Sequence, residues 1–190
     1  MRREKGWFKV EGVRPNGDRT LEEQMMGLAP ALALARGKSV LDLGCAEGLI
    51  ARQFALAGAR DVLGVELLTT HILVAEEACK DAPQTRFIVS ELSKYIDLRP
   101  QPEQFDLVLA LGIAHKLADP GKLIRFAARS AREWMMFRAP ARSAEGWVKS
   151  KFGDGQCHVP TIMAEEGFAE RETIKGVRGE SVQYWQRSAA

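Results

Sequence analysis

Short apolar runs alternate with helical patterns along most of the chain. Near-continuous apolar stretches predict strands at residues 39–43, 61–65, 85–90, 104–110 and 132–137. Such runs are typical of parallel strands that are buried on both faces of a sheet. Between them apolar residues recur at helical spacing, as Ile50, Phe54 and Ala57 do. This alternation predicts an α/β fold, a doubly wound sheet with right-handed crossovers and helices on both faces.

The two ends of the chain depart from this alternation. Thr20 and Glu23 fit a capping box ahead of apolar residues at helical spacing, and Pro30 predicts a break or kink. We therefore expect residues 1–37 to form an N-terminal helical segment that covers the functional site, with simple packing on the sheet edge as the alternative. At the other end, residues 168–175 and 181–187 predict a hairpin instead of a crossover.

Length and composition narrow the class of protein. A chain of 190 residues with 46% hydrophobic residues fits one compact domain, so we expect residues 38–190 to form a single unit behind the N-terminal segment. The net charge of +2 marks neither a nucleic-acid binder nor a membrane-surface protein, although a local basic patch leaves RNA open. Three scattered cysteines and the lack of an apolar leader predict a cytoplasmic protein. The sequence does not indicate an oligomeric state.

Residues 39–51 predict a strand that turns sharply into a helix. Gly44 and Gly48 allow backbone to approach a ligand closely, and Asp42 lies just inside the strand end. A dinucleotide-binding turn would require G-x-G-x-x-G, whereas these glycines are spaced G-x-x-x-G with Ala46 between them. A carboxylate at Asp42 would repel a pyrophosphate but suits an ammonium group. The alternative is a generic strand-turn-helix of any α/β domain.

This turn resembles motif I, D-x-G-x-G-x-G, of the class I (Rossmann-like) S-adenosylmethionine-dependent methyltransferases. Glu66 ends the second strand, where a carboxylate can accept both hydroxyls of a ribose, and it matches the acidic residue of motif II. The resemblance implies S-adenosylmethionine as cofactor. It also implies a mostly parallel seven-stranded sheet of order 3-2-1-4-5-7-6 with the last strand antiparallel.

The same resemblance supplies the other cofactor residues. Glu91 stands where the family usually places an Asp for the adenine amino group, and it is one methylene longer. Residues 105–120 are similar to the motif IV region, which would place its strand end beneath the methionine part of the cofactor. The predicted cofactor-binding set is Asp42, Gly44, Cys45, Ala46, Gly48, Glu66, Leu67, Ser90, Glu91, Leu92, Ala110, Leu111 and Gly112.

Candidate catalytic and acceptor-binding residues follow the fourth and fifth strands. His115, with an ordinary pKa near 6.5, can take a proton from a hydroxyl or amine. Alternatively, it stacks on the cofactor or caps a short helix. Residues 138–160 combine Gly, Pro, basic and aromatic residues and predict a flap over the acceptor site. Arg138, Trp147 and Lys151 would bind an anionic acceptor there, unless the segment is a solvated basic loop.

Motifs that are missing from the sequence restrict the activity further. Residues 110–113 lack the [N/D/S]-P-P-[Y/F/W] element of adenine-N6 methylation of nucleic acids and the cysteine of RNA cytosine-C5 methylation. No ligand cluster has metal-site spacing. The sequence therefore favours methyl transfer to an oxygen or nitrogen of a small molecule. Open alternatives are an RNA or protein acceptor, a non-catalytic cofactor-binding regulator and a nucleotide-dependent oxidoreductase.

Overall fold

The computed structural model describes residues 6–10, 17–140 and 146–189 of the chain. Its strands are β1 (Gly6–Phe8), β2 (Gly17–Arg19), β3 (Ser39–Leu43), β4 (Asp61–Glu66), β5 (Thr85–Val89), β6 (Phe105–Leu111), β7 (Ala131–Ala139), β8 (Trp147–Lys149), β9 (Gln156–His158), β10 (Phe168–Lys175) and β11 (Ser181–Arg187). Its helices are α1 (Leu21–Met25), α2 (Ala29–Ala33), α3 (Leu49–Leu56), α4 (Thr69–Ala78), α5 (Leu92–Asp97), η1 (Ala114–Lys116), α6 (Pro120–Ser130), α7 (Val159–Glu165) and η2 (Val177–Gly179).

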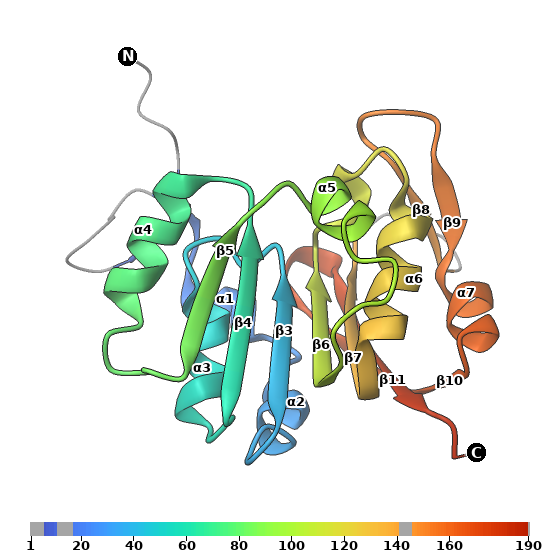
Figure 1. Cartoon of the computed structure of the whole chain (residues 1–190). Helices are drawn as coiled ribbons and strands as arrows, with labels where there is room; N and C mark the ends of the chain where they lie inside the picture. The colour runs from blue at the N-terminus through green and yellow to red at the C-terminus, as the bar shows by residue number, and fades with distance from the viewer. Residues whose placement is uncertain (1–5, 11–16, 141–145, 190) are drawn as a thin grey trace.

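Seven of the strands form the central sheet, in the order β5-β4-β3-β6-β7-β11-β10 (Figure 1). The pairs β3–β4, β4–β5, β3–β6 and β6–β7 are parallel, and β11 runs antiparallel to both β7 and β10. In chain order this is 3-2-1-4-5-7-6 with the last strand antiparallel, so the predicted topology is confirmed. The order reverses beside β3, and ligands of open α/β sheets bind at such a reversal, beyond the carboxyl ends of the strands.

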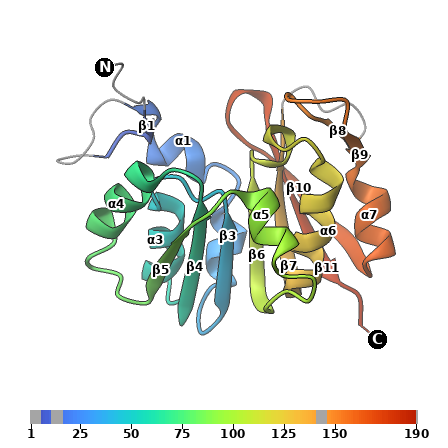
Figure 2. The ribbon, with the colours of Figure 1, turned by 45° about the horizontal axis from the view of Figure 1, so that its top comes forward.

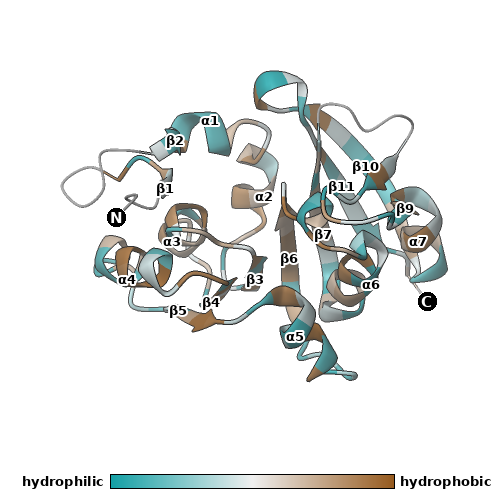
Figure 3. Cartoon of the chain, turned by 90° about the horizontal axis from the view of Figure 1, so that it is seen from above, coloured by the Kyte–Doolittle hydropathy of each residue, from teal (hydrophilic) through white to brown (hydrophobic). Residues whose placement is uncertain are grey.

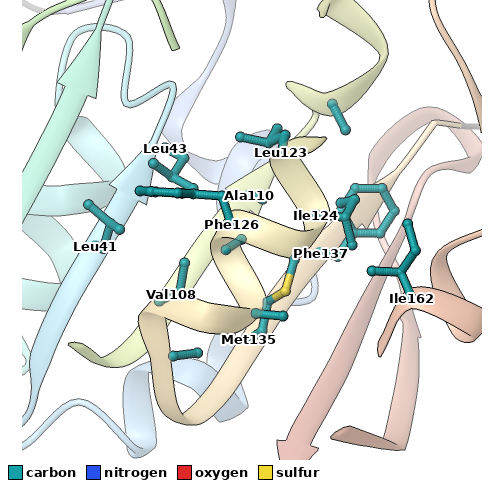
Figure 4. Packing of buried hydrophobic residues seen from close by; sticks show 14 of the residues in the cluster. Leu41, Leu43, Val108, Ala110, Leu123, Ile124, Phe126, Met135, Phe137 and Ile162 are labelled. Atoms are coloured by element: carbon teal, nitrogen blue, oxygen red, sulfur yellow. The ribbon is translucent and has the colours of Figure 1, made fainter. Parts of the chain in front are cut away.

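Helices cover both faces of the sheet, as the alternating pattern predicted. On one face α5, α6 and α7 pack over a cluster that includes Leu41, Val108 and Phe137 (Figure 4). On the other face α1 to α4 pack over Val40, Leu109 and other buried residues. Successive residues of β3 and β6 therefore face opposite cores, which explains their near-continuous apolar sequence. Seen from above, the central strand β6 is hydrophobic, whereas α1 at the rim is largely hydrophilic (Figure 3).

Local signals in the sequence explain several element ends. Thr20 and Glu23 form the predicted capping box of α1, with side chain and backbone bonded in both directions. Asp119 caps α6 by accepting from the backbone N–H of Lys122, and Pro120 occupies the first helical position. Pro30 does not cause the break between α1 and α2. It lies in the first turn of α2, and the chain turns before it.

Four features of the fold were not predicted. The short strands β1 and β2 pair with each other near the N-terminus and lie with α1 at the end toward which β3 and β4 point (Figure 2). Helix α5 follows β5 directly. The segment 138–160, predicted as a flap, contains the β8–β9 hairpin and the start of α7, which packs on α6. Its residues 141–145 lie outside the described residues, as do residues 1–5 and 11–16 of the predicted N-terminal segment.

Candidate functional site

A cavity of about 650 Å³ opens at the carboxyl ends of β3 to β6. Each of these strands contributes residues that the sequence predicted for a cofactor. They are Gly44 and Ala46 after β3, Glu66 and Leu67 at β4, Glu91 and Leu92 after β5, and Leu111 and Gly112 at β6. The volume is that of a small-molecule site. The parallel sheet thus gathers side chains that are up to 68 positions apart in the sequence.

The turn after β3 has an unusual backbone. Gly44 and Gly48 have φ of 83° and 71°, and Ala46, in place of a middle glycine, has φ of 48°. An added Cβ on Gly48 would lie 2.7 Å from the Cβ of Ala75 and 2.9 Å from the Phe87 ring. Gly48 is therefore required for packing α3 against α4 and β5, and it does not line the cavity. Backbone strain at Ala46 is the kind that persists at binding sites.

Asp42 lies beneath this turn and is almost completely buried. Its Oδ2 has no hydrogen-bond partner among the described residues. Burial, and secondarily the charge of Glu66, raises the pKa of Asp42 to about 7, against the opposing effect of Arg138. Because a buried polar atom nearly always has a partner, this oxygen suits a cationic group that reaches it from outside. Asp42 does not itself line the cavity.

Glu66 is the acidic side chain at the end of β4 and lines the cavity. Its Oε2 accepts from the backbone N–H of Ala46, and its Oε1 accepts from that of Leu68, each at 3.1 Å. Burial acts to raise the pKa of Glu66, but His71 and these two amides outweigh it and hold the pKa below the ordinary value. The carboxylate is thus ionised and fixed in place, as an acceptor for two hydroxyls should be.

The remaining predicted cofactor residues divide into two groups. Glu91 is exposed and precedes α5, whose first residue Leu92 is buried; both line the cavity, whereas Ser90 does not. Cys45 and Ala110 are buried behind the cavity wall. Burial raises the pKa of Cys45 well above its ordinary value, so this thiol is an inert packing group.

His115 differs from the expectation. It lies in η1, half-buried, and is not among the side chains that line the cavity. Its Nδ1 has no hydrogen-bond partner among the described residues. Burial, together with the charges of Lys151 and Lys116, lowers its pKa to about 4. The pKa of His115 thus lies well below the ordinary histidine value of 6.5, and the ring is neutral and weakly basic at neutral pH.

The three predicted acceptor-binding residues are not brought together. Arg138 belongs to β7 and not to a loop, and it is 2% exposed. Its guanidinium donates to the side chain of Gln24 at 2.7 Å and to the backbone carbonyl of the same residue. Trp147 lines a second, separate hollow beside His158. Lys151 is exposed, and its backbone N–H donates to the carbonyl of His115. Arg138 is thus a structural donor in this structure.

Several residues of the cavity were missed or rated too low. Trp7, Lys116 and Phe152 line it, and the Lys116 ammonium lies 4.4 Å from the centroid of the Trp7 ring. His71, which no sequence motif marked, also lines it, five residues after Glu66. That spacing puts His71 in the first turn of α4 and could have indicated its place. No local signal connects Trp7 to a turn about 40 residues later.

Within the described residues, no group of three or more His, Cys, Asp or Glu side chains could hold a metal ion. In the same part of the chain, no helix is both long and apolar enough to cross a membrane.

Comparisons with known proteins agree with this geometry. Residues 40–133 match a family model described as a methyltransferase domain. The chain is 28% identical over 150 residues to a ubiquinone biosynthesis O-methyltransferase of Paracidovorax citrulli, a match covering 77% of this chain. It spans 62% of that relative's length.

Solved structures share the fold. The magnesium protoporphyrin IX methyltransferase ChlM of Synechocystis PCC 6803, with bound S-adenosylhomocysteine, superimposes with a TM-score of 0.65 at 15% identity, covering 85% of this chain and 82% of that one. The [4+2]-cyclase SpnF also gives a TM-score of 0.65, at 14% identity over 86% and 81% of the two chains. At such identities the likeness concerns the fold alone. The matched model identifies residues 40–133 as a methyltransferase domain, and the sheet order and the acidic residues at the ends of β3 and β4 are similar to those of the class I S-adenosylmethionine-dependent methyltransferases.

Proposed function

We propose that the cavity binds S-adenosylmethionine and that the chain transfers a methyl group to an oxygen or nitrogen of a small-molecule acceptor. The observation that carries this proposal is the fixed, ionised carboxylate of Glu66 at the end of β4, next to the turn at Ala46. A ribose can donate both hydroxyls to such a group. The unpartnered oxygen of Asp42 fits a cationic group, so the ribose and the ammonium group of the cofactor both find suitable residues.

The chain's own residues have limited chemical work in this reaction. When bound, S-adenosylmethionine supplies a methyl group on a sulfonium, which is already a good leaving group, so alignment of the acceptor is the main requirement. Glu91 and Leu92 hold the adenine end in this proposal. Trp7 and Phe152 line the cavity and help to exclude water from it. His115 as proton acceptor stays a prediction, and its lowered pKa argues against a large contribution.

Two observations support a small acceptor. Much of the cavity wall is apolar, with Leu67, Leu92, Leu111, Ile113 and Leu117 among its side chains. The names of the relative and of ChlM refer to ubiquinone biosynthesis and to magnesium protoporphyrin IX, both of which concern small molecules. We also propose that the N-terminal segment covers the site, because Trp7 lines the cavity. A cytoplasmic location likewise stays a prediction.

The test is methyl transfer from labelled S-adenosylmethionine to a cell extract that is split into small-molecule, RNA and protein fractions. We expect label in the small-molecule fraction, and much less of it with Glu66→Ala at a low concentration of S-adenosylmethionine. Label confined to RNA or protein would identify the wrong acceptor class. Binding of S-adenosylmethionine without transfer to any fraction would favour a regulatory protein over an enzyme.

A further inference from the structure

His71 lies between two carboxylates from different parts of the chain. It is 7% exposed, in the first turn of α4. Its Nδ1 is 3.5 Å from Oε1 of Glu66, and its Nε2 is 3.5 Å from Oε1 of Glu47. These are ion-pair distances, longer than ordinary hydrogen bonds. The imidazole therefore occupies the space that separates the two acidic groups.

The second of these carboxylates fixes the N-terminal strand. Glu47 directly follows Ala46 in the turn after β3 and is completely buried. Its Oε1 accepts from the backbone N–H of Trp7 at 2.8 Å, and its Oε2 accepts from that of Phe8 at 3.0 Å. Hydrogen bonds to a charged acceptor are stronger than neutral ones. Glu47 thus attaches β1 to the turn, and β1 carries the Trp7 ring that lines the cavity.

A chain of contacts follows from these distances. It begins at Glu66, passes through the ring of His71 to Glu47, and ends at the backbone of Trp7. Without the imidazole, two carboxylates would face each other across a buried space, and like charges in such a space repel strongly. Asp42 and Lys116 also act on Glu66, but they do so from other elements and not from between the two carboxylates.

We propose that His71 is a positioning residue that couples nucleoside binding at Glu66 to the seating of β1, and with it Trp7, over the cavity. This inference rests on the proposed function, because it requires that Glu66 accepts the ribose hydroxyls. It assigns to His71 no contact with the reacting atoms. The ring keeps the two carboxylates apart and in place, so that disturbing either end disturbs the other.

The test combines calorimetric titration with S-adenosylhomocysteine and hydrogen exchange of the Trp7 and Phe8 amides. In the wild-type chain we expect the ligand to slow exchange at both amides. His71→Ala should weaken binding about tenfold, because Glu47 and Glu66 then repel each other and Glu66 is displaced from its place in the cavity. The ligand should also no longer slow exchange at β1. Leu73→Ala, on the exposed face of α4, is the matched control and should change neither quantity.

A double variant separates repulsion from simple loss of packing. Glu47→Gln removes one of the two charges, so adding it to His71→Ala should restore most of the lost affinity while the β1 amides stay unprotected. A purely structural role for His71 predicts no such rescue. If His71→Ala does not fold, the wild-type exchange experiment decides, because a ligand that binds without slowing exchange at Trp7 and Phe8 overturns the coupling. Unchanged affinity in a folded His71→Ala also overturns it, whereas a wild-type chain that binds no ligand refutes the proposed function itself.

Discussion

Replacing Asp42 by Asn separates stability from ligand binding. The pKa of Asp42 is raised to about 7 in the folded chain, mainly by burial, from an ordinary value of 3.8. When the pKa of a group is higher in the folded chain than in the unfolded chain, its contribution to stability is fully present at pH values below the unfolded pKa. That contribution is lost as the pH rises through the pKa of the group in the folded chain. The native state is therefore penalised for ionising Asp42 as the pH rises from about 4 to about 7.

The magnitude follows from the two pKa values. A rise from 3.8 to about 7 corresponds to a loss of about 4 kcal/mol of unfolding free energy once Asp42 is ionised. Asn cannot ionise, but its amide N–H₂ enters a buried place where Oδ2 has no partner, at a cost of about 1–2 kcal/mol. We expect Asp42→Asn to stabilise the chain by about 2–3 kcal/mol at pH 8, and to destabilise it by about 1–2 kcal/mol near pH 4.

Urea unfolding at these two pH values measures the change. Titration with S-adenosylhomocysteine should show weaker binding by Asp42→Asn, because the variant lacks the carboxylate that receives the ammonium group. In the wild-type chain, affinity should rise between pH 5.5 and 7.5 as Asp42 ionises, and in the variant it should stay flat. An Asp42→Asn chain that is less stable than wild type at both pH values would refute the reasoning.

Three further substitutions test the local geometry. Gly48→Ala should lower the free energy of unfolding by about 3 kcal/mol, because it places a side chain on a left-handed backbone and against Ala75. A loss below about 1 kcal/mol in urea unfolding would contradict this. Arg138→Leu should lower the free energy of unfolding by about 2 kcal/mol, because the two acceptors on Gln24 lose a buried cationic donor. An unchanged free energy of unfolding in urea would show that these hydrogen bonds contribute little. His115→Gln should keep kcat within about tenfold of the wild-type value, because a base of pKa about 4 contributes little at neutral pH. A thousandfold loss of kcat in steady-state assays would instead identify His115 as the general base.

The sequence predicted the sheet and the strand-end residues because both depend on local patterns. Near-continuous apolar runs located five strands of the central sheet, and the predicted hairpin located the other two. The motif residues at the strand ends identified one edge of the sheet. Glu66 is an example: its place at a strand end and its residue type are both readable from a few neighbouring positions. The topology then brings Glu66, Glu91 and Leu111 to one cavity.

What the sequence could not predict depends on contacts between distant segments. Nothing near Trp7 indicates that the buried Glu47 accepts its backbone N–H. Arg138 looked like a loop cation because the predicted strand ended at residue 137, yet β7 continues to Ala139 and buries the guanidinium against Gln24. The lowered pKa of His115 likewise follows from burial, which an isolated histidine in a sequence does not reveal.

The most direct test of the central claim is the affinity of the chain for S-adenosylhomocysteine, measured by calorimetry for wild type, Glu66→Ala and Glu77→Ala. The exposed Glu77 on α4 serves as the matched carboxylate control. We predict that the wild-type chain binds, that Glu77→Ala binds equally well, and that Glu66→Ala binds at least about tenfold more weakly, because the ribose hydroxyls lose a charged acceptor. A wild-type chain that gives no heat of binding, or a Glu66→Ala variant with unchanged affinity, would contradict the account.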